Sequence, residues 1–169
     1  MTILATERLS LRRLTADDAD FMLEMLNDPD FIRFVGDRNV RTAADARAYI
    51  VSGPLASYAE HGFGLWLIEL KATPAPIGIC GLLKRQGLAD VDIGFAVLPA
   101  YRSRGYALEA AAAVLNYGRG VLGLRRIVAI ADGDNVPSIK ILEKIGLKFE
   151  RMIQLSEDQP AIRLLASEA

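Results

Sequence analysis

The sequence predicts a single α/β domain over residues 1–169, and three observations lead to that fold class. Several stretches repeat apolar residues at helical spacing behind a Thr or Asn that could cap a helix. Between residues 62 and 98 the apolar residues instead alternate with a period of two, which is typical of strands. The chain contains no repeat, low-complexity segment or linker that would mark a boundary between two domains.

A strand and a capped helix are expected first. Residues 7–13 alternate between apolar and polar side chains, so we expect a strand with one buried face. Thr15 follows as a candidate N-cap, with acidic residues in the first turn, and apolar residues then recur at helical spacing. The run Asn27-Asp28-Pro29 should end this helix, and residues 30–40 should be irregular.

A second helix is expected behind Thr42. Asp45 stands three residues later, where its carboxylate would complete a capping box with the threonine. Gly53-Pro54 should interrupt this helix, and residues 55–60 could add another turn or two.

The middle of the chain predicts three consecutive strands, at residues 63–70, 77–84 and 91–98, of which the first two would form a hairpin. Side chains alternate along the third strand, so Val91, Ile93, Phe95 and Val97 would share one face, and Asp92, Gly94 and Ala96 the other. The remaining elements are a helix at about residues 104–119, a strand at 124–131, a helix from Asn135 to a Gly146 C-cap, and two short strands at 148–153 and 161–165.

Composition excludes several classes of function. The net charge is −1, so no broad basic field favours nucleic acid as a partner. The single cysteine, Cys80, excludes an internal disulfide and a multi-cysteine metal site, and its apolar surroundings predict a buried, inert thiol. The sequence shows no secretory signal and no apolar run of about 20 residues, so we expect a cytoplasmic protein with no membrane partner.

The turn Arg102-Ser103-Arg104-Gly105 links a strand to an alanine-rich helix. The first backbone N–H groups of a helix have no partners, and the helix dipole favours negative charge there, so this turn is a candidate anion site. The chain lacks both the P-loop pattern and the G-x-G-x-x-G dinucleotide pattern. The alternative is a basic loop that simply enters a helix.

Asn135 and Ser138 form a second candidate pair. They lie three residues apart at a helix start, so their side chains share a face. The alternative is purely structural, because Asn135 as N-cap and Pro137 in the first turn already make a good helix beginning.

The two segments together resemble a known family. The pattern Arg102-x-x-Gly105-x-Ala107 after a strand is similar to the acetyl-CoA signature of the GNAT N-acetyltransferases. Asn135-x-x-Ser138, followed by the run from Leu142 to Leu147, resembles the second block of that superfamily, and the opening Thr6-Glu7-Arg8-Leu9-x-Leu11-Arg12 resembles its RimJ/RimL-like branch. The resemblance covers nearly the whole chain.

The resemblance implies a mixed, strongly twisted sheet of about seven strands, with helices on both faces and splayed central strands. It implies that the strand from Asp92 parts from the strand that ends at Ala131, and that the pantetheine arm of acetyl-CoA lies in the gap. The residues implied to bind the cofactor are Phe95 and Val97 by their backbone, Arg102, Ser103, Arg104, Gly105, Tyr106 and Ala107 at the pyrophosphate, and Asn135 and Ser138 near the arm and sulfur. No metal is implied.

The implied reaction is transfer of an acetyl group from acetyl-CoA to a primary amine, on a protein N-terminus or a small molecule, by direct attack on the thioester. An ammonium has no lone pair, so a base must accept its proton, and Glu157 and the rival Asp92 are the candidates. The Val97 N–H would stabilise the oxyanion, and Ser138 could protonate the leaving thiolate. The enzyme would be a monomer or a homodimer. The alternatives are a catalytically silent CoA-binding sensor or interaction module, and a protein that binds a different nucleotide.

Overall fold

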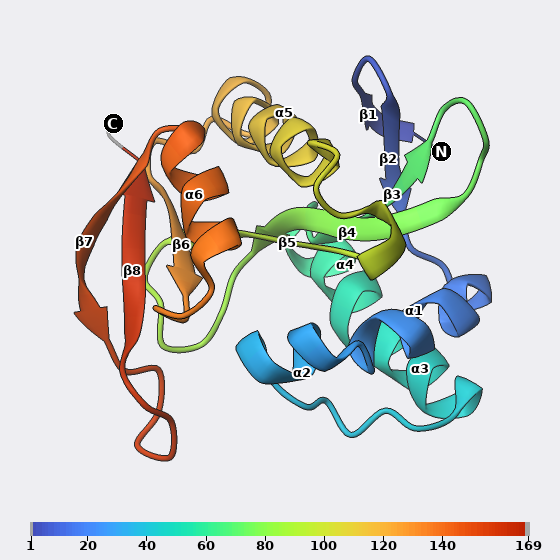
Figure 1. Cartoon of the computed structure of the whole chain (residues 1–169), viewed down its shortest axis with the longest axis horizontal. Coiled ribbons are helices and arrows are strands. Elements are labelled where there is room, and N and C mark those ends of the chain that lie inside the picture. The colour runs from blue at the N-terminus through green and yellow to red at the C-terminus, as the bar shows by residue number, and fades with distance from the viewer. Residues whose placement is uncertain (1, 168–169) are drawn as a thin grey trace.

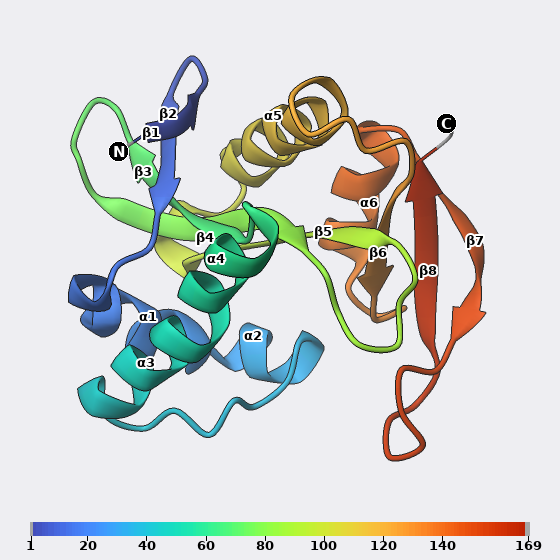
Figure 2. The ribbon, with the colours of Figure 1, turned by 180° about the vertical axis from the view of Figure 1, so that it is seen from behind.

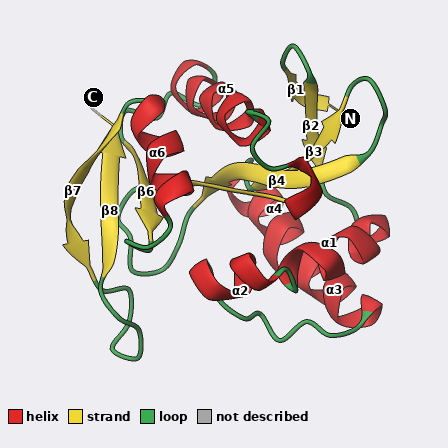
Figure 3. Ribbon diagram, in the orientation of Figure 1, coloured by secondary structure: helices red, strands yellow, loops and turns green. Residues whose placement is uncertain are grey.

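Eight strands form one open sheet with helices on both faces in a computed structural model, which describes residues 2–167 (Figures 1 and 3). The strands lie in the order β1-β2-β3-β4-β5-β6-β8-β7, and neighbours are antiparallel except for the parallel pair β5–β6. Their bounds are β1 Thr2–Ala5, β2 Leu9–Arg13, β3 Leu65–Leu70, β4 Pro76–Leu83, β5 Val91–Val97, β6 Ile127–Ala131, β7 Leu147–Ile153 and β8 Ile162–Ser167. The predicted mixed sheet is confirmed.

Helices α1–α4 lie on one face of the sheet, and α5 and α6 lie on the other (Figures 1 and 2). The helices are α1 Ala19–Leu26, α2 Pro29–Phe34, α3 Ala43–Ile50, α4 Ala56–His61, α5 Tyr106–Gly120 and α6 Val136–Lys144. Short helical turns are η1 Ala16–Asp18, η2 Val51–Leu55 and η3 Pro99–Tyr101. We call the two faces of the sheet the α3 face and the α5 face.

Alternating side chains of the strands supply both hydrophobic cores. On the α3 face, Leu67 of β3 and Ile79 of β4 pack with buried residues of α1 and α3 such as Met22 and Ile50. On the α5 face, Ile93 of β5 packs with alanines and Val114 of α5. Each fully buried Leu, Ile or Val side chain contributes about 1.5–3 kcal/mol relative to an exposed one, so the period-two pattern is also what holds the layers together.

Two N-terminal predictions were wrong. Strand β1 precedes the predicted first strand, and α2 begins at Pro29 and includes residues 30–34, which we expected to be irregular. The side chain of Asp28 accepts the N–H of Phe31, and Pro29 occupies the first position of the helix. A capping Asp followed by Pro is a signal for a helix start, although the same Pro also ends the preceding helix.

The predicted interruption at Gly53-Pro54 takes the form of a π-helical turn, η2, which joins α3 directly to α4. In an α-helix a proline cannot donate the i→i−4 hydrogen bond, and its ring clashes with the carbonyl of residue i−4. The wider π-helical turn lets the helical path continue through Pro54. The predicted caps of the neighbouring helices are confirmed, since Thr15 and Thr42 each form a capping box, with Asp18 and Asp45. Among residues 2–167, every helix is too short or too polar to cross a membrane.

Candidate active site

Strands β5 and β6 lie side by side for only two residues and then part. Val91 pairs with Ile127 and Asp92 pairs with Val128, and beyond these the described chain has no further pair between the two strands. Strand β5 continues as the partner of β4, and β6 continues as the partner of β8. The predicted splaying of the central strands is therefore confirmed, and it leaves a gap in the middle of the sheet (Figure 1).

The backbone of β5 faces this gap with hydrogen-bonding groups that lack a strand partner. Leu98 donates its N–H to the carbonyl of Ile77 in β4, at 2.8 Å. Backbone groups of successive residues in a strand point to opposite edges. The N–H and C=O groups of Phe95 and Val97 consequently point away from β4 and into the gap. The resemblance to the GNAT family implied that these two residues hold the pantetheine arm.

The chain passes from β5 to α5 through two residues with left-handed backbone. Ser103 has a φ of 62°, and Gly105, the N-cap of α5, has a φ of 82°. The helix begins at Tyr106, two residues later than expected. Within the described chain, the backbone N–H groups of residues 103–108 donate to no protein acceptor. Such a run of free donors at the positive end of a helix dipole is suited to an anion.

Arg102 contacts protein acceptors with all three nitrogens of its guanidinium group. Its Nε donates to the carbonyl of Val97 at 2.9 Å, its Nη1 to Asp30 at 2.7 Å, and its Nη2 to Asp28 at 2.5 Å. Two carboxylates therefore balance the charge that the sequence assigned to a pyrophosphate. The side chain of Arg102 ties the end of β5 to the start of α2.

Arg8, which was not among the predicted site residues, lies against the same turn. Its Nε donates to Oε1 of Glu109 at 2.7 Å, and its Nη1 donates to the carbonyl of Arg104 at 2.9 Å. The guanidinium carbon lies 4.5 Å from the centroid of the Tyr106 ring. Thr6 also donates to Glu109, so the connection between β1 and β2 is fastened to the first turn of α5. The Thr6-Glu7-Arg8 motif was the one sequence signal for this contact.

Asn135 and Ser138 meet at the start of α6. The side-chain oxygen of Asn135 accepts the N–H of Ser138 at 3.4 Å, and Pro137 lies in the first turn. The side-chain oxygen of Asn135 is therefore used as the cap of α6. In the part of the chain that the structure describes, the Asn135 amide nitrogen donates to no acceptor, so capping leaves this donor available.

Asp92 is fully buried and paired. Both of its carboxylate oxygens accept from Nε of Arg85, at 3.0 and 2.9 Å, and its side chain has no exposed surface. Asp92 lies on the α3 face of β5, at the last residue that pairs with β6. Burial raises the pKa of the Asp92 carboxyl, and the charge and hydrogen bond of Arg85 partly oppose that rise.

Glu157 lies in the connection between β7 and β8, where its side chain is exposed. This connection contacts the one between β4 and β5, because the carbonyl of Leu155 lies 3.1 Å from the position of a Cβ on Gly87. A groove of about 340 Å³ lies beside the two connections, lined by residues 87–90 and 151–154 together with Val128 and Leu164.

The remaining candidates for chemistry lie outside this arrangement. Cys80 is buried, as predicted, and burial raises the pKa of its thiol well above the ordinary range. The lone histidine, His61, stacks on Phe63 with ring centroids 5.5 Å apart. Residues 2–167 contain no group of three His, Cys, Asp or Glu side chains placed to hold a metal ion.

Known proteins share both the sequence and the fold. A family model described as an acetyltransferase (GNAT) domain matches residues 8–148. YoaA of Bacillus subtilis (strain 168), an uncharacterised N-acetyltransferase, is 31% identical over 153 residues, which is 90% of this chain and 86% of YoaA. A GNAT-family acetyltransferase structure from Bacillus anthracis is 28% identical with a TM-score of 0.79, and it covers 98% of this chain and 97% of its own.

A more distant structure, of the RimL acetyltransferase of ribosomal protein L7/L12 in complex with coenzyme A, has a TM-score of 0.84 at 14% identity. It covers 99% of this chain and 98% of its own, and this likeness is one of fold. The family model and YoaA each match most of the chain, and the parted central strands match the architecture that the signature motifs imply. The chain belongs to the GNAT family of acetyltransferases, and it is an N-acetyltransferase.

Proposed function

We propose that this enzyme transfers the acetyl group of acetyl-CoA directly to a primary amine, on a protein N-terminus or on a small molecule. One observation carries the proposal. The free edge of β5 leads directly to the free N–H groups at the start of α5. The amides of a pantetheine arm can pair with a strand edge, and a pyrophosphate suits a helix start, so the two features fit the two halves of one cofactor.

Different residues would bind different parts of acetyl-CoA. The backbone of Phe95 and Val97 would hold the arm, and the N–H groups of residues 103–107 would hold the pyrophosphate, with Arg104 adding charge. Arg102 would act on the cofactor indirectly, because its guanidinium group fixes the Val97 carbonyl at the end of the free edge. The Asn135 amide nitrogen and the Ser138 hydroxyl would contact the arm from the start of α6.

Acetyl-CoA supplies an activated thioester when it is bound. The chain must then admit a neutral amine, whose nitrogen forms a bond to the acetyl carbon as the bond to sulfur breaks. The N–H of Val97 would stabilise negative charge that develops on the acetyl oxygen. Ser138 would return a proton to the leaving sulfur, and this help is modest because a thiolate is already a good leaving group.

We assign the base that accepts the amine proton to Glu157. Its side chain is exposed in the connection between β7 and β8, and it would accept the amine proton directly or through water. The rival, Asp92, has both oxygens on Arg85 and no exposed surface, which favours a role in holding that arginine.

We further propose that the protein belongs to the RimJ/RimL-like branch, that it acts in the cytoplasm, and that it is a monomer or a homodimer. The contact of Thr6 and Arg8 with Glu109 supports the first point, because it gives the opening motif of that branch a function at the cofactor turn. Light scattering coupled to size exclusion measures the oligomeric state.

Acetyl transfer over a panel of amines tests the proposal. Release of free thiol from acetyl-CoA is followed with protein N-terminal peptides, amino acids, polyamines and amino sugars as acceptors, and calorimetry measures binding of CoA, ATP and NAD. We expect CoA to bind most tightly and at least one amine to accelerate thiol release.

Two other results would each contradict the proposal. Tight acetyl-CoA binding with no acceptor-dependent release would identify a silent sensor or interaction module. Binding of ATP equal to or tighter than that of CoA would identify a different nucleotide site.

A further inference from the structure

Arg85 is anchored at one end and has free donors at the other. Its Nε donates to both oxygens of the buried Asp92, whereas Nη1 and Nη2 donate to no acceptor among residues 2–167. The side chain of Arg85 is 28% exposed, so these two nitrogens carry a partly desolvated charge. An arginine with an unused pair of terminal nitrogens in such surroundings is suited to a planar anion.

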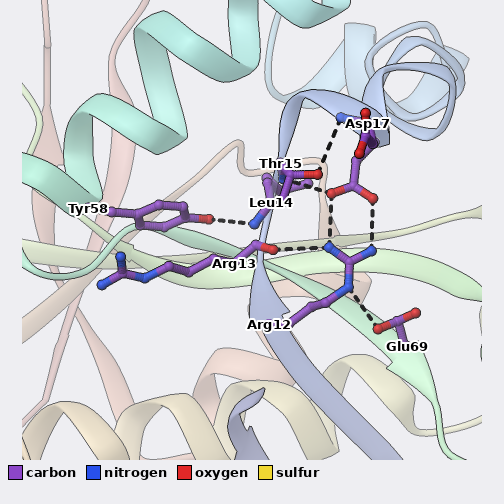
Figure 4. Close-up of polar contacts among 8 residues, drawn as sticks. Arg12, Arg13, Leu14, Thr15, Asp17, Tyr58 and Glu69 are labelled. Atoms are coloured by element: carbon purple, nitrogen blue, oxygen red, sulfur yellow. Dashed lines mark hydrogen bonds and ion pairs between the residues drawn. The ribbon is translucent and has the colours of Figure 1, made fainter. Parts of the chain in front are cut away.

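Arg12 shows how an arginine of similar exposure is used when its role is structural (Figure 4). It also lies on the α3 side of the sheet, and its side chain is 25% exposed. Its Nη1 and Nη2 both donate to Asp18, at 2.9 and 2.8 Å, and its Nε donates to Glu69 at 2.9 Å. Every nitrogen of Arg12 is therefore paired. Arg85, in contrast, donates to its carboxylate partner through Nε alone, so its Nη1 and Nη2 remain available to bind another group.

The open end of Arg85 lies beside the gap between β5 and β6. Nη2 is 4.0 Å from the position that a Cβ on Gly94 would occupy, so the absence of a side chain on Gly94 leaves space next to the guanidinium group. Gly94 is two residues beyond Asp92, in the part of β5 that has already left β6. Residues 92 and 94 share the α3 face, opposite the face that α5 covers.

The groove described above opens on the same face. Val128, which lines the groove and pairs with Asp92, points away from the α5-face core that holds its neighbours Ile127 and Ala129. In Figure 2 the connection between β4 and β5, which includes Arg85 as its second residue, descends beside β6 and β8. An acceptor that approaches the gap from the α3 face would therefore meet both Arg85 and the groove.

We propose that Arg85 binds an anionic group of the acceptor, a carboxylate or a phosphate, and that the preferred acceptors are amines that carry such a group. Asp92 is the positioning residue that fixes Nε of Arg85 and turns its terminal nitrogens toward Gly94. This inference rests on the proposed acetyl transfer and specifies the acceptor class of the same site.

Matched acceptor pairs test the inference. Aspartate and asparagine, glutamate and glutamine, and phosphoserine and serine are compared, as are short peptides that begin with these residues. For the unchanged enzyme we expect kcat/KM for the anionic member to exceed that for the neutral member by about 10- to 100-fold, as for one charge-assisted contact. Comparing the carboxylate with the phosphate pairs distinguishes the two anions.

Variants then test whether Arg85 is responsible for the preference for anionic acceptors. Arg85→Gln should abolish the preference, mainly by raising KM for the anionic acceptors, while Arg85→Lys should retain part of it. Asp92→Asn should raise the same KM without changing the pH profile of kcat, whereas a catalytic base at Asp92 would require a loss in kcat. Arg12→Gln is the matched control, because it should lower stability and leave the preference intact.

Calorimetry of the same acceptor pairs in the presence of CoA tests the inference even if turnover is absent. Equal binding or equal use of anionic and neutral acceptors by the unchanged enzyme would overturn the role of Arg85, as would a preference that survives Arg85→Gln. A lack of acceptor-dependent thiol release from acetyl-CoA would instead overturn the proposed function. Binding of acetyl-CoA should be the same in the Arg85 variants and the unchanged enzyme.

Discussion

Arg102 donates from Nη2 to Oδ2 of Asp28 at 2.5 Å, although 74 positions separate them in the sequence. The same oxygen accepts the N–H of Phe31 at 3.1 Å, so Asp28 caps α2 and holds the arginine of the turn at once. The other contacts of Arg102, to the carbonyl of Val97 and to Asp30, extend the link to the free edge of β5. A helix on the α3 face is thereby joined to the start of the candidate cofactor site.

Asp28→Ala should lower the free energy of unfolding by about 2 kcal/mol and weaken acetyl-CoA binding. Loss of the cap costs about 1 kcal/mol, and loss of a charge-assisted hydrogen bond adds a similar amount, discounted because Arg102 remains 34% exposed. Urea unfolding and calorimetry measure the two effects. Asp30→Ala, at a carboxylate that is 55% exposed, should cost less than about 1 kcal/mol, and equal losses in the two variants would contradict this account.

Gly105→Ala should destabilise the fold by about 1–2 kcal/mol, because a residue with a Cβ is strained at a φ of 82°. The added methyl group would lie 3.2 Å from Nη2 of Arg8, the end of a flexible side chain that can move, so the backbone dominates the cost. We also expect weaker binding of acetyl-CoA in calorimetry.

Ser103→Gly, in the same turn, is the control for Gly105→Ala, because it should not lower the stability of the fold. Ser103 already has a left-handed backbone, so glycine should leave stability unchanged or raise it by up to about 1 kcal/mol. A Gly105→Ala protein with undiminished affinity for acetyl-CoA would show that the pyrophosphate binds elsewhere.

Glu157→Gln should lower kcat by about 100-fold or more with the best amine, because removal of a general base costs at least that factor. The affinity for acetyl-CoA should stay unchanged, since the β7–β8 connection lies apart from the turn before α5 (Figure 1). Steady-state kinetics and calorimetry measure both. Asp158→Asn, at the neighbouring exposed carboxylate, is the control, and comparable kcat losses in the two variants would argue against Glu157 as the base.

Asp18 should make stability depend on acid pH. Burial alone would raise the pKa of its carboxyl, but hydrogen bonds from Arg12 and Thr15 and the charge of Arg12 outweigh it and hold the pKa below its ordinary 3.8. The folded state therefore binds fewer protons than the unfolded state in this range. The stabilisation is present above the unfolded pKa and is lost as the pH falls through the lower folded pKa.

The expected result for Asp18→Asn is a flatter decline of stability than in the unchanged protein between roughly pH 5 and pH 2. Urea unfolding at a series of pH values measures this slope. The neighbouring Asp17 is exposed, so Asp17→Asn should preserve the original slope. Identical slopes for Asp18→Asn and the unchanged protein would show that the Arg12–Asp18 pair does not govern acid stability.

Local patterns predicted most of the secondary structure because each depends on residues a few positions apart. Thr15 and Thr42 cap helices as expected, and strands β3, β4 and β5 lie within two residues of their predicted bounds. The errors have the same local origin. Asp28-Pro29 both ends one helix and starts the next, and β1 is a four-residue strand at the edge of the sheet with little pattern of its own.

The sequence by itself determined the family, the order of the elements and the turn from Arg102 to Gly105, since motif spacing and periodicity are properties of the linear chain. Only the tertiary structure decided which side chains meet. It placed Arg102 on Asp28, fastened Arg8 to Glu109, and left the terminal nitrogens of Arg85 open beside Gly94. These contacts join segments from different strands and helices, and they depend on strand register and on the packing of helices against the sheet, which no local pattern encodes.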